Sequence, residues 1–322
     1  METQPTVLYE PDGKAARRAA SVCAFAAVLA VAIPYALTFA FSFLRLRLFP
    51  DLRLSDSAQM LLTTAMADLI AMPLVWLLLL RRVPAGGAAQ DGATRTPLSL
   101  KKLAFYFPCI FLLMYGGAVL GRLIGALLGR GLADVVDDVM RSVDPWATLL
   151  CAVIVGPIAE ELFFRKAMID RLSGFRPTDA IVFTALLFAL SHGNLMQFLY
   201  AFPVGVLFGI IYCRTRNVGY TIVLHVLMNA VGGLVPQLLT PLEEAVAAGT
   251  AGAFGRTILS LYGIAVFAVC GIGLVILIRH RREFLPIPST NMRSRKELYL
   301  NAGWIVAGTL LIGLAVLSEI LL

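Results

Sequence analysis

Residues 180–213 read AIVFTALLFALSHGNLMQFLYAFPVGVLFGIIYC, a run of 34 residues without Asp, Glu, Lys or Arg. A transmembrane helix needs about 20 predominantly apolar residues to cross the hydrocarbon core of a bilayer. The run is therefore too long for one crossing and short for two full ones. It predicts a helical hairpin that turns below the outer membrane surface, near Ser191-His192-Gly193-Asn194.

The rest of the chain has the same apolar character. Of its residues 59% are hydrophobic and only 15% are charged, which excludes a soluble globule with a polar surface. The apolar segments lie at roughly 19–44, 57–80, 103–129, 146–168, 178–192, 195–213, 218–235, 256–278 and 302–321. We therefore predict an all-α fold, a polytopic transmembrane bundle of about 8–9 helices.

Lys and Arg indicate the orientation, because positively charged loops stay in the cytoplasm. With the N-terminus inside, 20 of the 27 Lys and Arg residues fall on the cytoplasmic side and six fall outside. An odd number of spans then places the C-terminus outside. The first segment is too long for the apolar region of a cleaved signal peptide, so we expect a retained first helix.

The net charge of +7 does not indicate nucleic acid here, because the basic residues lie between apolar segments. Their expected partners are anionic lipid headgroups. The cysteines occur singly, without metal-ligand spacing, and we interpret them as small core residues. They are Cys23, Cys109, Cys151, Cys213 and Cys270.

Three strings place polar groups inside the apolar segments. They are Glu160-Glu161-Leu162-Phe163-Phe164-Arg165, Phe188-Ala189-Leu190-Ser191-His192 and His225-Val226-Leu227-Met228-Asn229. Ionisable groups at membrane depth are costly unless they pair or line a wet cavity, so they indicate a functional site. At about 1.5 Å per residue, His192, His225 and Glu160 lie roughly 20, 12 and 15 Å from the cytoplasmic ends of their helices. The three can therefore meet near the middle of the membrane.

Spacing within the first string predicts an ion pair. Glu161 and Arg165 are four residues apart, so they share a helix face. Glu160 is turned about 100° away and is free to meet another neighbour. Gly156-Pro157, just before the glutamates, should loosen or kink the helix and admit polar groups.

The other two strings also use four-residue spacing. His225 and Asn229 present an imidazole and an amide on one helix face, and Phe188 lies one turn from His192, where it could shield the ring from lipid.

Such groups can activate water. A carboxylate and an imidazole can take a proton from water, while a second imidazole and an amide stabilise an oxyanion, as peptide hydrolysis requires. Glu160, His192 and His225 could instead hold a divalent metal such as zinc, although the string His-Glu-x-x-His is missing.

The ordered motifs Glu160-Glu161-x-x-x-Arg165, Phe188-x-x-x-His192 and His225-x-x-x-Asn229 resemble those of the CPBP intramembrane proteases. That family includes type II CAAX prenyl endopeptidases and proteins linked to bacteriocin processing or immunity. The resemblance implies a helical membrane fold with a buried polar cavity open toward the cytoplasm. It divides the chain into N-terminal helices (1–145), a catalytic core (146–235) and C-terminal helices with a basic cytoplasmic loop (236–322).

The resemblance also implies roles for the motif residues. Glu160 and His192 would activate the water, while His225 and Asn229 would stabilise the oxyanion. Glu161 and Arg165, with Phe188 beside His192, would order the site. We favour a metal-free reaction, because an Asn amide suits oxyanion binding better than metal ligation.

Two other functional classes stay open. A proton-coupled transporter could use Glu160 and His192 as a relay, although we find no internal repeat of the kind many transporters have. A catalytically idle family member could act as a scaffold or immunity protein. The expected substrate of a protease is a membrane-associated protein or peptide precursor, possibly lipidated, in a bacterial cell membrane.

We interpret the other charged groups in or beside the apolar segments as structural and not as part of the site. Asp68 and Arg122 predict a buried ion pair between neighbouring helices. Glu319 should lie at the membrane interface, and His280 belongs to a solvated basic cluster.

Overall fold

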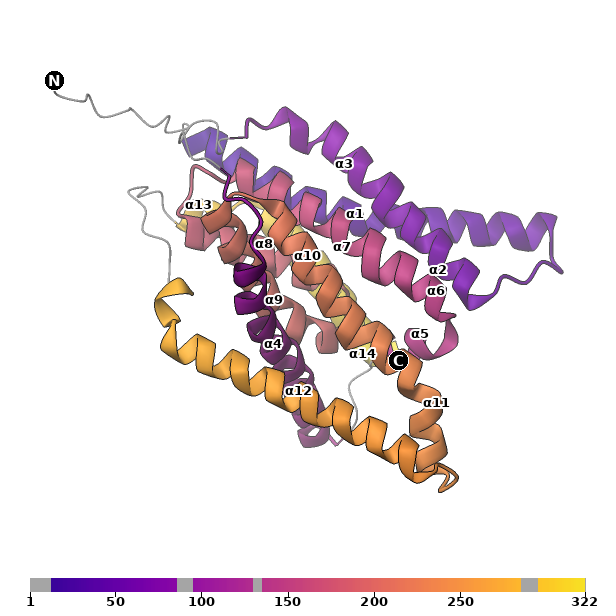
Figure 1. The fold of residues 1–322 in the computed structure, drawn as a ribbon. Coiled ribbons are helices and arrows are strands. Elements are labelled where there is room, and N and C mark those ends of the chain that lie inside the picture. Colours follow the sequence, from indigo (N-terminus) through magenta and orange to yellow (C-terminus); the bar gives the residue numbers. More distant parts are fainter. Residues whose placement is uncertain (1–12, 86–94, 130–134, 285–294, 322) are drawn as a thin grey trace.

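A computed structural model describes residues 13–85, 95–129, 135–284 and 295–321 (Figure 1). Every regular element in these ranges is helical. In chain order the elements are α1 (Gly13–Leu48), α2 (Asp56–Thr64), η1 (Ala65–Ala71), α3 (Met72–Leu78), η2 (Leu80–Arg82), α4 (Leu100–Leu127), α5 (Val135–Ser142), α6 (Pro145–Thr148), η3 (Leu149–Val155), α7 (Gly156–Glu160), η4 (Glu161–Ile169), α8 (Pro177–Leu190), α9 (Leu195–Thr215), α10 (Val218–Asn229), η5 (Ala230–Leu234), α11 (Val235–Ala247), α12 (Ala253–Arg279), η6 (Arg281–Glu283), α13 (Arg295–Tyr299) and α14 (Ala302–Leu321).

Several of these elements join into longer continuous helices. Eight helices in the described ranges are long and apolar enough to cross a membrane, and α8 is a shorter apolar helix of 14 residues. The predicted all-α transmembrane bundle is confirmed.

The α8–α9 hairpin turns where the sequence predicts. Helix α8 ends at Leu190 and α9 begins at Leu195. Gly193 takes a left-handed conformation with φ of +70°, and the Asn194 side chain caps α9 by accepting the Gln197 N–H at 2.7 Å. At about 1.5 Å per residue, α8 is about 21 Å long, which is less than the roughly 30 Å of the hydrocarbon core.

Two glycines of α9 let the hairpin helices approach closely. A Cβ atom added to Gly209 would lie 2.8 Å from the Ile181 side chain, and one added to Gly205 would lie 3.2 Å from the Phe188 ring. Their four-residue spacing is that of small-residue helix contacts in membranes. The close approach of α9 at Gly205 packs its backbone against the Phe188 ring and limits the movement of that ring.

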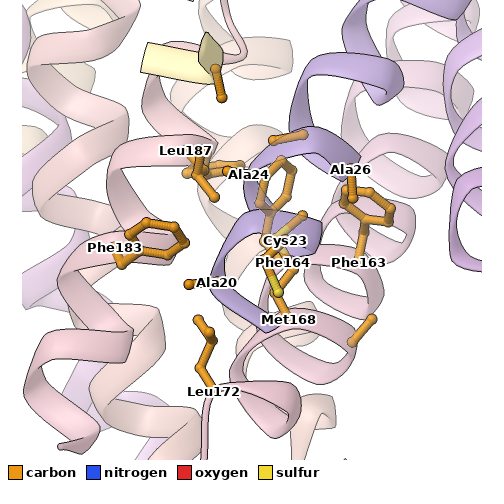
Figure 2. Close-up of a cluster of buried hydrophobic side chains, with 14 of the residues drawn as sticks. Ala20, Cys23, Ala24, Ala26, Phe163, Phe164, Met168, Leu172, Phe183 and Leu187 are labelled. Carbon is orange, nitrogen blue, oxygen red and sulfur yellow. The ribbon is translucent and has the colours of Figure 1, made fainter. Parts of the chain in front are cut away.

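A buried apolar cluster joins α1, η4 and α8 (Figure 2). Small residues of α1, among them Ala20, Cys23 and Ala24, allow the aromatic side chains of Phe163 and Phe164 to pack closely. A second cluster joins α4, α9 and α10. All five cysteines are free, and Cys23, Cys109 and Cys151 are buried. The two clusters anchor the helices that carry the polar strings.

The last helix, α14, lies alongside α8. Trp304 packs on Phe183 with ring centroids 5.1 Å apart, and the Glu319 carboxylate accepts the Leu195 N–H at 3.1 Å. A carboxylate at a helix N-terminus stabilises that terminus. Glu319 therefore holds the turn between α8 and α9, a role that its sequence position does not reveal.

The predicted ion pair between Asp68 and Arg122 is wrong. Arg122 is exposed on α4, which packs on α9 and α12, whereas η1 carries Asp68 against α1 and α7. The two helices place these charges in different parts of the bundle.

Candidate active site

The helix that carries the glutamates changes its winding at Gly156-Pro157. Segments η3 and η4, on either side of α7, are π-helical, and the Gly156 N–H bonds five residues back, to the Cys151 carbonyl. The next carbonyl in this register is that of Ala152, and it faces Pro157, which has no N–H. It accepts instead from Asn229 Nδ2 at 2.7 Å. The predicted loosening is therefore present as π-helical turns, which often occur at functional sites.

Glu161 and Arg165 form the predicted ion pair. Arg165 Nη1 lies 3.0 Å from Glu161 Oε1, and the side chains are 2% and 0% exposed. The guanidinium also lies over the Phe188 ring, 4.2 Å from its centroid, and 5.3 Å from that of Phe208. Glu161 Oε2 and both Nη atoms of Arg165 have no aligned hydrogen-bond partner. The pair is thus an ionic contact with spare hydrogen-bonding capacity.

His225 connects the two adjacent glutamates. Its Nδ1 lies 3.0 Å from Glu161 Oε1, and its Nε2 lies 3.7 Å from Glu160 Oε2. The distance from Nδ1 to Glu161 is that of a hydrogen bond, whereas the distance from Nε2 to Glu160 is too long for one. The Glu161 carboxylate can only accept, so Nδ1 carries a proton.

The two glutamates differ in access. Glu161 is 0% exposed, whereas the Glu160 side chain is 24% exposed. Glu161 is committed to Arg165 and His225. Glu160 retains carboxylate oxygens that a water molecule or substrate can reach.

His192 lies in the turn after α8, and its ring has a defined orientation. Nδ1 is 2.8 Å from the Phe188 carbonyl, so it carries the proton and Nε2 keeps its lone pair. The Phe188 ring packs edge-on against His192 at 4.9 Å and against His225 at 6.2 Å. Phe188 is therefore in the middle of the polar cluster and does not face lipid.

The structure joins the predicted site residues unequally. Contacts link four of the residues into one group, namely Glu160, Glu161, Arg165 and His225. Asn229, on α10, donates to a backbone carbonyl of the helix that carries the glutamates. His192 reaches this group through Phe188. Within the described residues, Glu160 and His192 share no hydrogen bond or ion pair.

The alternative metal set is not assembled. In the parts of the chain that the structure describes, no three His, Cys, Asp or Glu side chains are grouped closely enough to hold an ion. Glu160, His192 and His225 as arranged therefore do not fit a zinc site.

The chain is similar to known membrane peptidases over part of its length. Residues 142–231 match the family model described as type II CAAX prenyl endopeptidase Rce1-like. The chain is 28% identical over 164 residues to the putative membrane peptidase YdiL of Bacillus subtilis (50% of this chain, 66% of that protein). It is 34% identical over 95 residues to the membrane-embedded CAAX protease MroQ of Staphylococcus aureus (27% of this chain, 38% of that protein). The matches thus span less than two thirds of either relative. No solved structure matches the chain.

Fold and site together define a multi-pass helical membrane protein with a cluster of Glu, His and Arg at membrane depth. The chain is similar to CAAX-type membrane peptidases, and the match to the family model covers residues 142–231. The matched residues 142–231 contain every residue of the three motifs.

Proposed function

We propose that the protein is an intramembrane endopeptidase that hydrolyses a peptide bond of a membrane-associated protein or peptide precursor. The division of labour between the adjacent glutamates supports this most directly. Glu161 is buried and neutralised by Arg165, while Glu160 is accessible beside His225. An accessible carboxylate next to an ordered imidazole suits general acid–base catalysis.

In the proposed reaction, Glu160 and the Nε2 lone pair of His192 hold the attacking water. Glu160 takes a proton from this water as its oxygen bonds to the carbonyl carbon. Glu160 then gives the proton to the amide nitrogen as the carbon–nitrogen bond breaks. The products are the leaving amine and the new carboxylic acid, and the acid passes its remaining proton to the amine or to solvent to become a carboxylate.

His225 and Asn229 are our proposed donors to the oxyanion. One Asn229 N–H is bonded to the Ala152 carbonyl, which leaves the second for the substrate. His225 bonds Glu161 through Nδ1, so it can donate from Nε2 when the ring carries both protons. Donors aimed at a developing oxyanion supply much of the catalysis in acyl transfer.

A direct test is cleavage by purified protein in liposomes. Peptides from membrane proteins would be supplied with and without a lipid on cysteine, because one relative is named a CAAX protease. A Glu160→Gln variant should capture uncleaved substrate, which mass spectrometry would identify. Absence of cleavage by wild type would favour the idle scaffold. Cleavage by Glu160→Ala and His192→Ala at the wild-type rate would refute the roles proposed for these two residues. Substrate-driven proton flux would instead indicate a transporter.

The metal-free mechanism predicts that chelators leave activity intact. Purified protein treated with EDTA or phenanthroline should keep more than half of its cleavage rate, because water activation is assigned to Glu160 and His192. Added zinc should not raise the rate. Complete loss with chelator and recovery with zinc would replace this mechanism with a metal-dependent one.

A further inference from the structure

Asp68 is a membrane-depth carboxylate that the three motifs do not include. Its helix runs parallel to the helix that carries Glu160 and Glu161. Contacts at two heights along these helices fix how they are aligned. At the first, Ser57 Oγ donates to Asp144 Oδ2 at 2.7 Å and accepts the Asp144 N–H at 2.9 Å. At the second, Asp68 lies against Gly156. Asp68 is eleven residues beyond Ser57, and Gly156 is twelve residues beyond Asp144. At about 1.5 Å per residue, Asp68 is about 16 Å from the Ser57 level, near the middle of the membrane.

Gly156 provides the space that Asp68 occupies. A Cβ atom added to Gly156 would lie 3.7 Å from Asp68 Oδ2, so the carboxylate rests against the bare backbone of α7. Glu160 follows Gly156 by four residues, one turn further along the same helix. Glu160 is therefore about one helical turn, roughly 6 Å along the axis, beyond the level at which Asp68 contacts the backbone.

The local charges leave Asp68 without a counterion. Arg165 is occupied by Glu161, and His225 lies between the two glutamates. Within the described residues, Asp68 has no ion pair or hydrogen bond, and it is only partly buried. A carboxylate at membrane depth is costly without a positive partner, and a second carboxylate nearby adds to that cost.

We propose that Asp68 is a specificity-determining residue that binds a positively charged group of the substrate, a Lys or Arg side chain close to the scissile bond. This inference rests on the proposed peptidase function and names its substrate class. The cation supplies the charge that the protein lacks beside Gly156. Glu160, one turn away, remains free for the water.

The test uses full-length protein in detergent micelles and a set of apolar fluorogenic decapeptides. In each peptide one position is Lys or its neutral analogue norleucine. Wild type should cleave the best Lys peptide at least tenfold more efficiently than its norleucine partner, with the difference mainly in KM. Asp68→Asn should remove this preference, so that its kcat/KM values for the Lys and norleucine peptides differ less than twofold. Asp68→Lys should favour a Glu peptide instead.

A matched control is Asp56→Asn, an exposed Asp at the start of the same helix, which should keep the preference. Binding is measured separately with Glu160→Gln and with the double variant that adds Asp68→Asn, by fluorescence anisotropy. Equal binding of Lys and norleucine peptides by Glu160→Gln overturns this inference, as does an equal loss for both peptides in Asp68→Asn. Preferential binding of Lys peptides without any cleavage by wild type would refute the proposed function alone.

Discussion

Glu160→Gln should lower the rate of peptide cleavage by at least about 1,000-fold while leaving the fold intact. Loss of a general base alone costs about 100- to 10,000-fold, and Glu160 also donates the proton to the leaving amine. The amide of Gln has nearly the same shape but cannot take a proton from water. Cleavage of one substrate peptide by equal amounts of folded protein would measure the effect.

Little destabilisation is expected in this variant. Glu160 is 24% exposed, and its contact with His225 is 3.7 Å long, so the substitution breaks no short hydrogen bond. Glu243→Gln is the matched control, because Glu243 and Glu244 form another adjacent pair and both are exposed on α11. The control should keep full activity. A Glu160→Gln protein that retains a tenth of the wild-type rate would rule out Glu160 as the base.

Local spacing in the sequence predicts part of this site well. The contact between Glu161 and Arg165 follows from a four-residue offset, and so does the packing of Phe188 on His192. The turn at Ser191–Asn194 follows from the length of one uncharged run. These features depend on one helix or one hairpin, so they need no knowledge of how the helices are arranged.

The contacts that the sequence predicted wrongly or did not predict depend on how the helices are arranged. Opposite charge in consecutive apolar segments predicted that Asp68 pairs with Arg122, but η1 turns Asp68 toward α7. The contact of Glu319 with Leu195 joins residues 124 positions apart. Charge and hydropathy carry no information on which helices are neighbours or in which register they pack.

The hydrogen bond from Asn229 to the Ala152 carbonyl could be predicted from the sequence only in part. Pro157 removes a backbone N–H, and the sequence shows that one carbonyl must therefore find another partner. Which carbonyl this is depends on the winding of the helix. An α-helical register points four residues back, to Val153, but the π-helical register frees Ala152.

Breaking the buried ion pair should have the largest effect on stability. Arg165→Met should destabilise the protein by about 3–5 kcal/mol, because it leaves the Glu161 carboxylate buried without its cation. Glu161 is 0% exposed, so water cannot reach it to compensate. The Met side chain also loses the cation–π contact with Phe188, whose centroid is 4.2 Å from the guanidinium. Thermal unfolding in detergent, followed by loss of helical circular dichroism, measures the change.

Two further variants separate the charge from the packing. Lys166→Met removes the cation of a neighbouring i,i+4 pair with Asp170, but the Lys166 side chain is 43% exposed. That change should cost less than about 1 kcal/mol. The double variant Glu161→Gln with Arg165→Met should recover most of the stability, because it removes the unpaired charge. It should not recover cleavage, since a Gln at position 161 no longer holds His225 as a carboxylate does. Equal stability of the single and double variants would show that Arg165 contributes through packing on Phe188 and not through its charge.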